Sequence, residues 1–192
     1  MTETKKEIRT RIISELQSLS KPVYKQQSYE IAQNLYKHPL FQNAHHIGLT
    51  ISKSPEVDTL QIIRTAWALG KKVSVPKCLP KTKEMVFRQL DRFDQLETVY
   101  SGLFEPIEAE TALTEGHEMD LLLVPGVAYA KNGYRIGFGG GYYDRYLINY
   151  KGDTISLAMD CQLEESIPAE DHDVPVQHLI TNKGAIVVGT NN

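Results

Sequence analysis

Residues 135–144 combine a glycine cluster with one arginine and one aspartate, in an order that suits a phosphate. Four glycines lie between Arg135 and Asp144, namely Gly137, Gly139, Gly140 and Gly141. Glycine lets backbone N–H groups approach a ligand closely because no Cβ stands in the way. A helical pattern opens at Tyr142, and the unpaired N–H groups of a helix start favour an anion. The segment therefore predicts a phosphate site in which Arg135 contacts a phosphate oxygen and Asp144 binds magnesium.

The glycine cluster matches neither common phosphate-binding fingerprint. No Gly-Lys-Ser/Thr follows it, so it is not a P-loop. The dinucleotide fingerprint needs a third glycine where this chain has Tyr142 or Asp144, depending on the starting glycine. Asp160 ends a predicted strand about 20 residues downstream, where a ribose-binding acid would lie. Dinucleotide binding therefore stays open as an alternative, as does a loop that only connects two elements.

Composition and charge narrow the class of protein. The chain has 192 residues, of which 41% are hydrophobic and 23% charged, as in ordinary globular proteins. Its formal net charge of −3 gives no basic footprint for nucleic acid, so an anion would need a local basic pocket. Cys78 and Cys161 are too few for a disulfide scaffold, which favours a reducing compartment. The first ten residues lack an apolar signal core, and no run could span a membrane, so we expect a cytoplasmic protein.

Helical and strand patterns alternate along the chain. The predicted helices cover residues 4–19, 59–69 and 142–150, and a further helix is predicted to begin after Ser20. The predicted strands cover residues 46–51, 71–78, 84–90, 120–125, 154–160, 178–181 and 185–189. Residues 94–116 show no clear pattern, and we expect a loop over 105–111. We predict one α/β domain over residues 1–192, with three layers and a mostly parallel sheet flanked by helices. It is Rossmann-like without the dinucleotide fingerprint, and its ligand should lie at the carboxyl ends of the strands.

The glycine segment and several others resemble a known family. The signature consists of residues 125–128, 133–137 and 139–145. It resembles that of 5-formyltetrahydrofolate cyclo-ligase, also called methenyltetrahydrofolate synthetase. Weaker similarities are found in the N-terminal basic helix, the acidic segment after the first strand, an internal Glu-Pro pair and a late acidic stretch, at residues 5–9, 56–59, 105–106 and 170–173. The resemblance covers essentially the whole chain in the expected order.

The resemblance implies an ATP- and Mg²⁺-dependent ring closure of 5-formyltetrahydrofolate to 5,10-methenyltetrahydrofolate, with release of ADP and phosphate. An N-formyl amide is a poor electrophile, and its oxygen is a poor leaving group. Transfer of the γ-phosphoryl group to the formyl oxygen makes an iminium phosphate, which the neighbouring N10 attacks as phosphate departs. The protein contributes positioning and charge stabilisation.

The resemblance places ATP against the N-terminal helix and the glycine segment. The implied ATP contacts are Lys5, Lys6, Glu7, Ile8, Arg9, Arg135, Ile136, Gly137, Phe138, Gly139, Gly140, Gly141, Tyr142 and Tyr143. Lys5 and Arg9 lie one helical turn apart on the same face, which could instead be only a solvated basic face. Arg135 is the implied catalytic residue that neutralises the γ-phosphate through a forked contact. Its alternative role is a surface salt bridge.

The implied folate contacts partly overlap with those for ATP. They are Ile51, Glu56, Phe138, Gly139, Gly140, Gly141 and Tyr142. Glu56 would accept hydrogen bonds from a donor edge of the folate, and Ile51 would line an apolar wall. Phe138 and Gly140 stand where other family members can carry basic residues, and Phe138 cannot pair with a phosphate. Phe138 could serve the folate instead, and Tyr142 and Tyr143 could close over either ligand or only pack against the sheet.

Asp144 is the second implied catalytic residue and, together with Asp173, an implied magnesium ligand. Asp171 competes with Asp173 for that role, and Asp144 could instead only complement a helix dipole. The expected partners are small molecules, with no nucleic acid or membrane, and the expected state is a monomer. Two other classes remain open, a nucleotide-binding regulatory module that binds ATP without turnover and a sugar-phosphate isomerase or acyl-transfer enzyme that is active without ATP.

Overall fold

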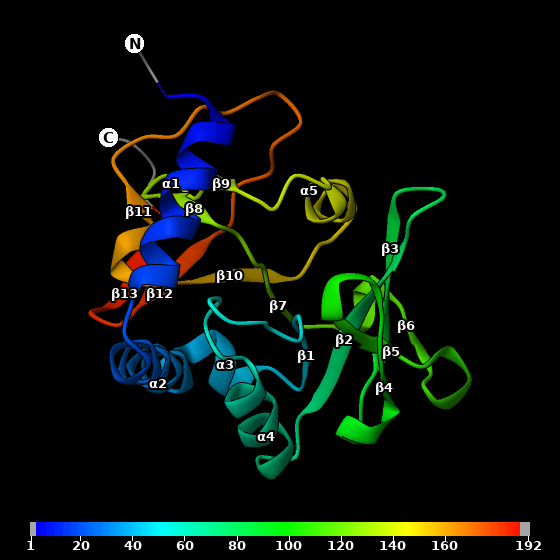
Figure 1. Cartoon of the computed structure of the whole chain (residues 1–192). Coiled ribbons are helices and arrows are strands. Elements are labelled where there is room, and N and C mark those ends of the chain that lie inside the picture. Colours follow the sequence, from blue (N-terminus) through cyan, green and yellow to red (C-terminus); the bar gives the residue numbers. More distant parts are fainter. Residues whose placement is uncertain (1–2, 189–192) are drawn as a thin grey trace.

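The computed structural model describes residues 3–188 and is built around one large sheet (Figure 1). Its eight strands follow the order β13-β12-β10-β7-β1-β2-β3-β6. Their bounds are β1 (His46–Gly48), β2 (Lys72–Leu79), β3 (Glu84–Gln89), β6 (Leu113–Thr114), β7 (Leu121–Leu123), β10 (Asp153–Ala158), β12 (His178–Thr181) and β13 (Gly184–Val187). The five strands from β12 to β2 run parallel, while β13, β3 and β6 pair antiparallel at the two sides. The sheet is therefore mostly parallel at its centre, as predicted.

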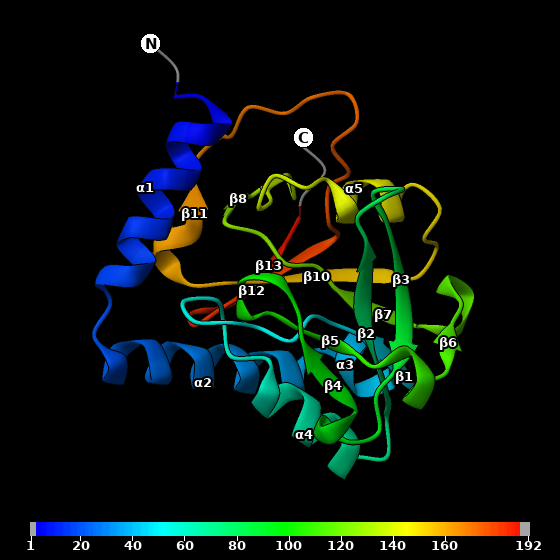
Figure 2. The same ribbon diagram turned by 45° about the vertical axis from the view of Figure 1, so that its right-hand side comes forward.

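Helices cover both faces of this sheet, which explains the unbroken apolar runs of its central strands. The helices are α1 (Lys5–Ser18), α2 (Lys21–Lys37), α3 (Pro39–Asn43), α4 (Leu60–Ala68) and α5 (Tyr142–Leu147). Figures 1 and 2 show α2, α3 and α4 on one side and α5 on the other. All residues of β1 and β7 are buried, as expected for parallel strands covered on both faces. Among residues 3–188, no helix combines the length and the apolar character needed to cross a membrane.

Helix α1 stands at the side of the molecule and is held by its apolar face (Figure 2). Ile8, Ile12 and Leu16 are buried, at the three-to-four spacing that the sequence shows. A capping box fixes its start, in which Thr4 and Glu7 each hydrogen-bond the backbone N–H of the other. The helix therefore has a well-defined first turn beside the glycine segment.

Short strands build two smaller sheets that the sequence pattern does not reveal. They are β4 (Leu96–Thr98) with β5 (Phe104–Pro106), and β11 (Leu163–Glu164) with β8 (Ala128–Ala130) and β9 (Arg135–Ile136). Short 3₁₀ helices are found in the connecting segments, at Phe93–Gln95, Tyr100–Gly102, Glu108–Glu110, Gly116–Glu118 and Asp160–Gln162. The β8–β9 hairpin is important for the site because it carries Arg135 on a strand rather than on a loop.

The predicted elements are present, but several ends differ. β1 stops at Gly48 instead of residue 51, and α5 stops at Leu147 instead of residue 150. The strand predicted over 185–189 is β13, which ends at Val187, and Gly189 lies outside the described residues. The α/β class and the flanking helices are confirmed. The prediction of one domain over residues 1–192 includes residues 1–2 and 189–192, which also lie outside the described part.

Candidate active site

A cleft of about 530 Å³ opens between α1, the loop after β1, strand β2, the β4–β5 hairpin and the glycine segment. The carboxyl ends of β1, β2 and β7 all contribute to its lining, as expected for an open parallel sheet. Ten predicted site residues line it, namely Ile51, Glu56, Arg135, Gly137, Phe138, Gly140, Gly141, Tyr142, Tyr143 and Asp144. Segments far apart in the sequence therefore meet in one cavity.

The glycine loop adopts backbone conformations that require glycine. Gly139 has φ of +103° and Gly141 has φ of +67°. Two arginines hold the loop by its carbonyl groups, since Arg9 Nε donates to Gly137 O at 2.8 Å and Arg145 Nη1 donates to Gly140 O at 2.9 Å. Among the described residues, none accepts a hydrogen bond from the backbone N–H groups of residues 138–141. The loop therefore offers free donors beside the cleft.

Arg135 is buried, so the surface salt-bridge interpretation is wrong. Its side chain is 2% exposed. The guanidinium donates to Pro125 O at 3.3 Å, to Val174 O at 2.7 Å and to Asp144 Oδ1 at 3.1 Å. These contacts use three of the five N–H donors of an arginine. Arg135 thus links the end of β7, the first turn of α5 and the segment after residue 170. Two of its N–H donors have no partner in the described part of the chain.

Asp144 is held in a geometry that leaves one carboxylate oxygen available. Its Oδ1 accepts from Arg135 and from the backbone N–H of Val174 at 3.2 Å. Both contacts use the same oxygen, and Asp144 lines the cleft. Within residues 3–188 the other oxygen, Oδ2, makes no hydrogen bond or ion pair. A carboxylate that is oriented by a cation and an amide and keeps one unpaired oxygen fits a hard divalent ion such as Mg²⁺.

Asp173 lies beside the N-terminal helix. Its Oδ2 accepts from Lys5 Nζ at 2.6 Å and from Glu170 N at 2.7 Å. Burial alone would raise the pKa of Asp173, but the hydrogen bonds from Lys5 and Glu170 outweigh it and lower that pKa. Ligand atoms of Glu170, His172 and Asp173 lie within 4.8 Å of one another, and neither Asp171 nor Asp144 belongs to this group.

The predicted ATP contacts at residues 5–9 of α1 have different surroundings in the structure. Arg9 contacts the loop, and Lys5 reaches the acidic segment. The Ile8 side chain is 4% exposed and packs in the core, so an ATP contact by Ile8, which stays a prediction, would involve its backbone. Glu7 caps its own helix, and Lys6 is exposed. Ile136 is likewise a core residue, at 1% exposure.

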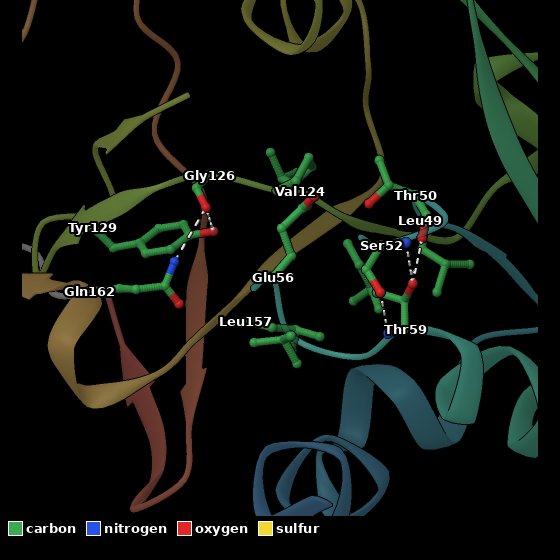
Figure 3. Close-up of a pocket in the computed structure, with 13 residues that line it drawn as sticks. Leu49, Thr50, Ser52, Glu56, Thr59, Val124, Gly126, Tyr129, Leu157 and Gln162 are labelled. Atoms are coloured by element: carbon green, nitrogen blue, oxygen red, sulfur yellow. Dashed lines mark hydrogen bonds between the residues drawn. The ribbon is translucent and has the colours of Figure 1, made fainter. Parts of the chain in front are cut away.

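Glu56 lines a small side pocket of about 40 Å³ next to the cleft. The side pocket and the cleft share five lining residues. Figure 3 shows Glu56 in the middle of this lining, with Tyr129 and Gln162 to one side and Ser52 and Thr59 to the other. Burial raises the pKa of Glu56 to about 7, against a weak opposing effect of the Lys53 N–H at 3.4 Å. A hydrogen-bond donor on a ligand would therefore stabilise the charged form of this carboxyl group and offset its desolvation.

Comparisons with known proteins identify a family for the chain. The model of the 5-formyltetrahydrofolate cyclo-ligase family matches residues 1–182. The chain belongs to this family. A 5-formyltetrahydrofolate cyclo-ligase of Escherichia coli K12 is 33% identical over 158 residues, covering 79% of this chain and 86% of that protein. One from Haemophilus influenzae is 30% identical over 183 residues, covering 91% and 96%.

Solved structures of the family share the fold. The NMR structure of Aquifex aeolicus 5,10-methenyltetrahydrofolate synthetase matches with a TM-score of 0.85 and 28% identity, over 98% of this chain and 94% of that chain. A 5,10-methenyltetrahydrofolate synthetase from Mycoplasma pneumoniae matches at 0.76 and 23% identity, over 94% and 99%. The second likeness supports the fold alone.

Two residues of the candidate site escaped the sequence analysis. Gln162 donates to Val127 O at 3.0 Å, and Tyr129 donates to Gly126 O at 3.0 Å, so both fix the backbone after β7 around Glu56. Gln162 follows the carboxyl end of β10 and could have been found by the strand-end rule. Tyr129 lies on a three-residue strand whose sequence gives no such signal.

Proposed function

We propose that this chain catalyses the ATP-dependent closure of 5-formyltetrahydrofolate to 5,10-methenyltetrahydrofolate. The observation that carries the proposal is one cleft into which the glycine loop, the Arg135–Asp144 pair and Glu56 all open. The first two features suit a polyphosphate, and the third suits a ring with hydrogen-bond donors. Membership of the cyclo-ligase family supports the same reaction.

In this reaction the bonds form between the two substrates, so the side chains act mainly by positioning the substrates. The formyl oxygen attacks the γ-phosphorus, ADP leaves, and the carbon becomes an electrophilic iminium. N10 then attacks that carbon and loses its proton, and phosphate departs with the C–O electron pair. The N–H groups of residues 138–141, the two remaining donors of Arg135 and the guanidinium of Arg9 would stabilise the phosphate charge.

The folate would occupy the part of the cleft next to Glu56. Its carboxylate would accept hydrogen bonds from the donor edge of the pterin ring, and the apolar side chain of Ile51 would lie along the ring. Phe138 is 55% exposed at the cleft, so its ring suits contact with the aromatic part of the substrate better than contact with phosphate.

Asp144, through its free Oδ2, and Asp173 would hold Mg²⁺. When bound, the ion would supply positive charge that stabilises the phosphate oxygens. Lys5 occupies one oxygen of Asp173, so the lysine would share that carboxylate with the metal or move to the phosphates. Cytoplasmic location and a monomeric state stay predictions.

A turnover assay with 5-formyltetrahydrofolate, ATP and Mg²⁺ tests the proposal, with the near-ultraviolet absorption of the methenyl product as the signal. We expect a signal that requires all three components. ATP binding without turnover would favour the regulatory module. Turnover without ATP would favour the isomerase or acyl-transfer alternative.

A further inference from the structure

Among residues 3–188, two cationic side chains line the cleft, Arg135 and Lys53, and their surroundings differ. Arg135 is buried and forms an ion pair with Asp144 at 3.1 Å. Lys53 is exposed on the loop after β1, and its Nζ donates to Ser101 O at 2.6 Å. Within the described part of the chain, that carbonyl is the partner of the Lys53 ammonium, and no carboxylate pairs with it. The cleft therefore carries one positive charge that the protein itself does not neutralise.

The Lys53 ammonium is positioned by the turn at the tip of the β4–β5 hairpin. Ser101 has φ of +59°, which is uncommon for a residue other than glycine, and Gly102 has φ of +69°. A Cβ atom on Gly102 would lie 3.5 Å from Lys53 Nζ, so the turn lies against the ammonium. A lysine ammonium has three N–H donors, and the Ser101 carbonyl takes one of them. Lys53 is therefore an oriented cation that can still donate to a ligand.

Lys53 lies near the part of the cleft that the proposed function assigns to the folate. Its backbone N–H is 3.4 Å from Oε1 of Glu56, the proposed pterin contact. The proposed phosphate contacts belong instead to β9, the glycine loop and α5, and Figure 2 shows α5 above the β4–β5 hairpin. Leu103 and Phe104, next to Ser101 on this hairpin, line the cleft and are 43% and 49% exposed. Neighbouring exposed apolar side chains at a cavity are typical of a ligand contact.

The chemistry of the substrate supplies a partner for the unneutralised charge. 5-Formyltetrahydrofolate consists of a pterin ring, a benzoyl ring and a glutamate with two carboxylates. With the pterin at Glu56, the benzoyl ring would lie along Leu103 and Phe104, and the carboxylates would reach the exposed rim of the cleft. We propose that the Lys53 ammonium binds a carboxylate of the glutamyl tail, and so selects folates with an anionic tail. This inference rests on the proposed function, because it takes 5-formyltetrahydrofolate as the ligand.

The test compares 5-formyltetrahydrofolate with 5-formyl-6-methyltetrahydropterin, which keeps the ring and lacks the benzoylglutamate tail. We measure equilibrium binding of both ligands and of ATP to the wild type and to Lys53→Met, in which methionine keeps an apolar stem and removes the charge. Lys53→Met should weaken folate binding about fivefold, a modest loss because solvent screens an exposed charge. It should bind the truncated pterin and ATP as the wild type does.

Two further measurements separate a substrate contact from a structural role. Lys53→Met should raise the KM for 5-formyltetrahydrofolate and leave kcat unchanged, because the tail is remote from the formyl group. Added salt should weaken folate binding to the wild type more steeply than to Lys53→Met. The control is Lys151→Met, which removes the same charge from an exposed lysine outside the lining of the cleft and should change none of these values.

Four outcomes overturn the inference. Lys53→Met could bind folate as the wild type does, lose affinity equally for the truncated pterin, weaken ATP binding instead, or match Lys151→Met in its loss. An equal loss for the two pterin ligands would make Lys53 only a link between the loop after β1 and the β4–β5 hairpin. If the wild type binds and turns over 5-formyltetrahydrofolate while Lys53→Met behaves identically, only the inference fails. If the wild type does not bind 5-formyltetrahydrofolate, the proposed function fails and the inference fails with it.

Discussion

At the residue scale, Glu56 stands out because its environment opposes its charge. The pKa of its carboxyl rises from 4.5 to about 7 in the folded protein because of burial. Between these values the native state binds more protons than the unfolded chain. The free energy of unfolding therefore falls as pH rises through this window. A ligand with hydrogen-bond donors would offset this loss of stability. The presence of a glutamate at this buried position is therefore better explained by ligand binding than by a contribution to stability.

We expect Glu56→Gln to separate these two effects. Glutamine keeps the shape and removes the buried charge, so the ligand-free variant should gain thermal stability relative to wild type at pH 8 and show little gain at pH 5. Folate affinity should fall about 10- to 100-fold, the range for a hydrogen bond to a charged group. Melting curves at the two pH values and a folate titration measure both. Equal stability differences at pH 5 and pH 8 would contradict the raised pKa.

Asp144 gives a second prediction at this scale. Asp144→Asn keeps an oxygen for Arg135 and for the Val174 N–H but loses the negative charge. The fold should persist, while Mg²⁺-dependent turnover should drop by about a hundredfold or more. The control is Asp171→Asn, an exposed neighbour of the acidic group with the same charge change. Turnover of Asp144→Asn within threefold of wild type, at every Mg²⁺ concentration, would remove Asp144 from the metal site.

At the element scale, the predictable parts of the structure are those with a regular hydrophobic period. The patterns over residues 120–125 and 154–160 predicted the central strands β7 and β10, and the period of Ile8, Ile12 and Leu16 predicted α1. The β8–β9 and β4–β5 hairpins have strands of only two or three residues, too short for any period. Their pairing depends on contacts distant in sequence, so the buried setting of Arg135 was not predictable, and its catalytic role stays a prediction.

The glycine loop is the element whose conformation can be tested most directly. Gly139→Ala places a side chain at φ of +103°, a strained conformation, and crowds the phosphates, so ATP affinity should fall about tenfold. Gly184→Ala is a matched control, because Gly184 has φ of +128° with open space around it and lies on β13, away from the cleft. Both changes should destabilise the protein by about 1–3 kcal/mol. Nucleotide titrations should then show a loss only for Gly139→Ala, and equal affinities would mean that the loop merely connects β9 to α5.

At the scale of the whole molecule, the site joins parts that are remote in sequence. Lys5 Nζ contacts Glu170 at 2.9 Å and Asp173 at 2.6 Å, a link across more than 160 residues. Burial opposes the charge of Lys5, but these carboxylates outweigh it and raise the pKa of Lys5, so the ammonium stays charged at neutral pH. This explains why α1 could be assigned to the site by resemblance but not by its own pattern, which resembles any solvated basic helix.

The same link yields the prediction that tests how the parts cooperate. Lys5→Ala should raise the KM for ATP about tenfold while folate affinity stays unchanged, because the lost ammonium contacts Asp173, which the proposed function assigns to the metal and phosphate end of the site. Lys151→Ala removes the same charge from an exposed lysine with no assigned contact and should leave both values unchanged, so net charge is controlled. Steady-state kinetics with either substrate varied give the two constants. Equal increases of the KM for ATP in the two variants would show an effect of net charge alone. A loss of folate affinity in Lys5→Ala would show that α1 maintains the structure of the cleft and does not act on the nucleotide specifically.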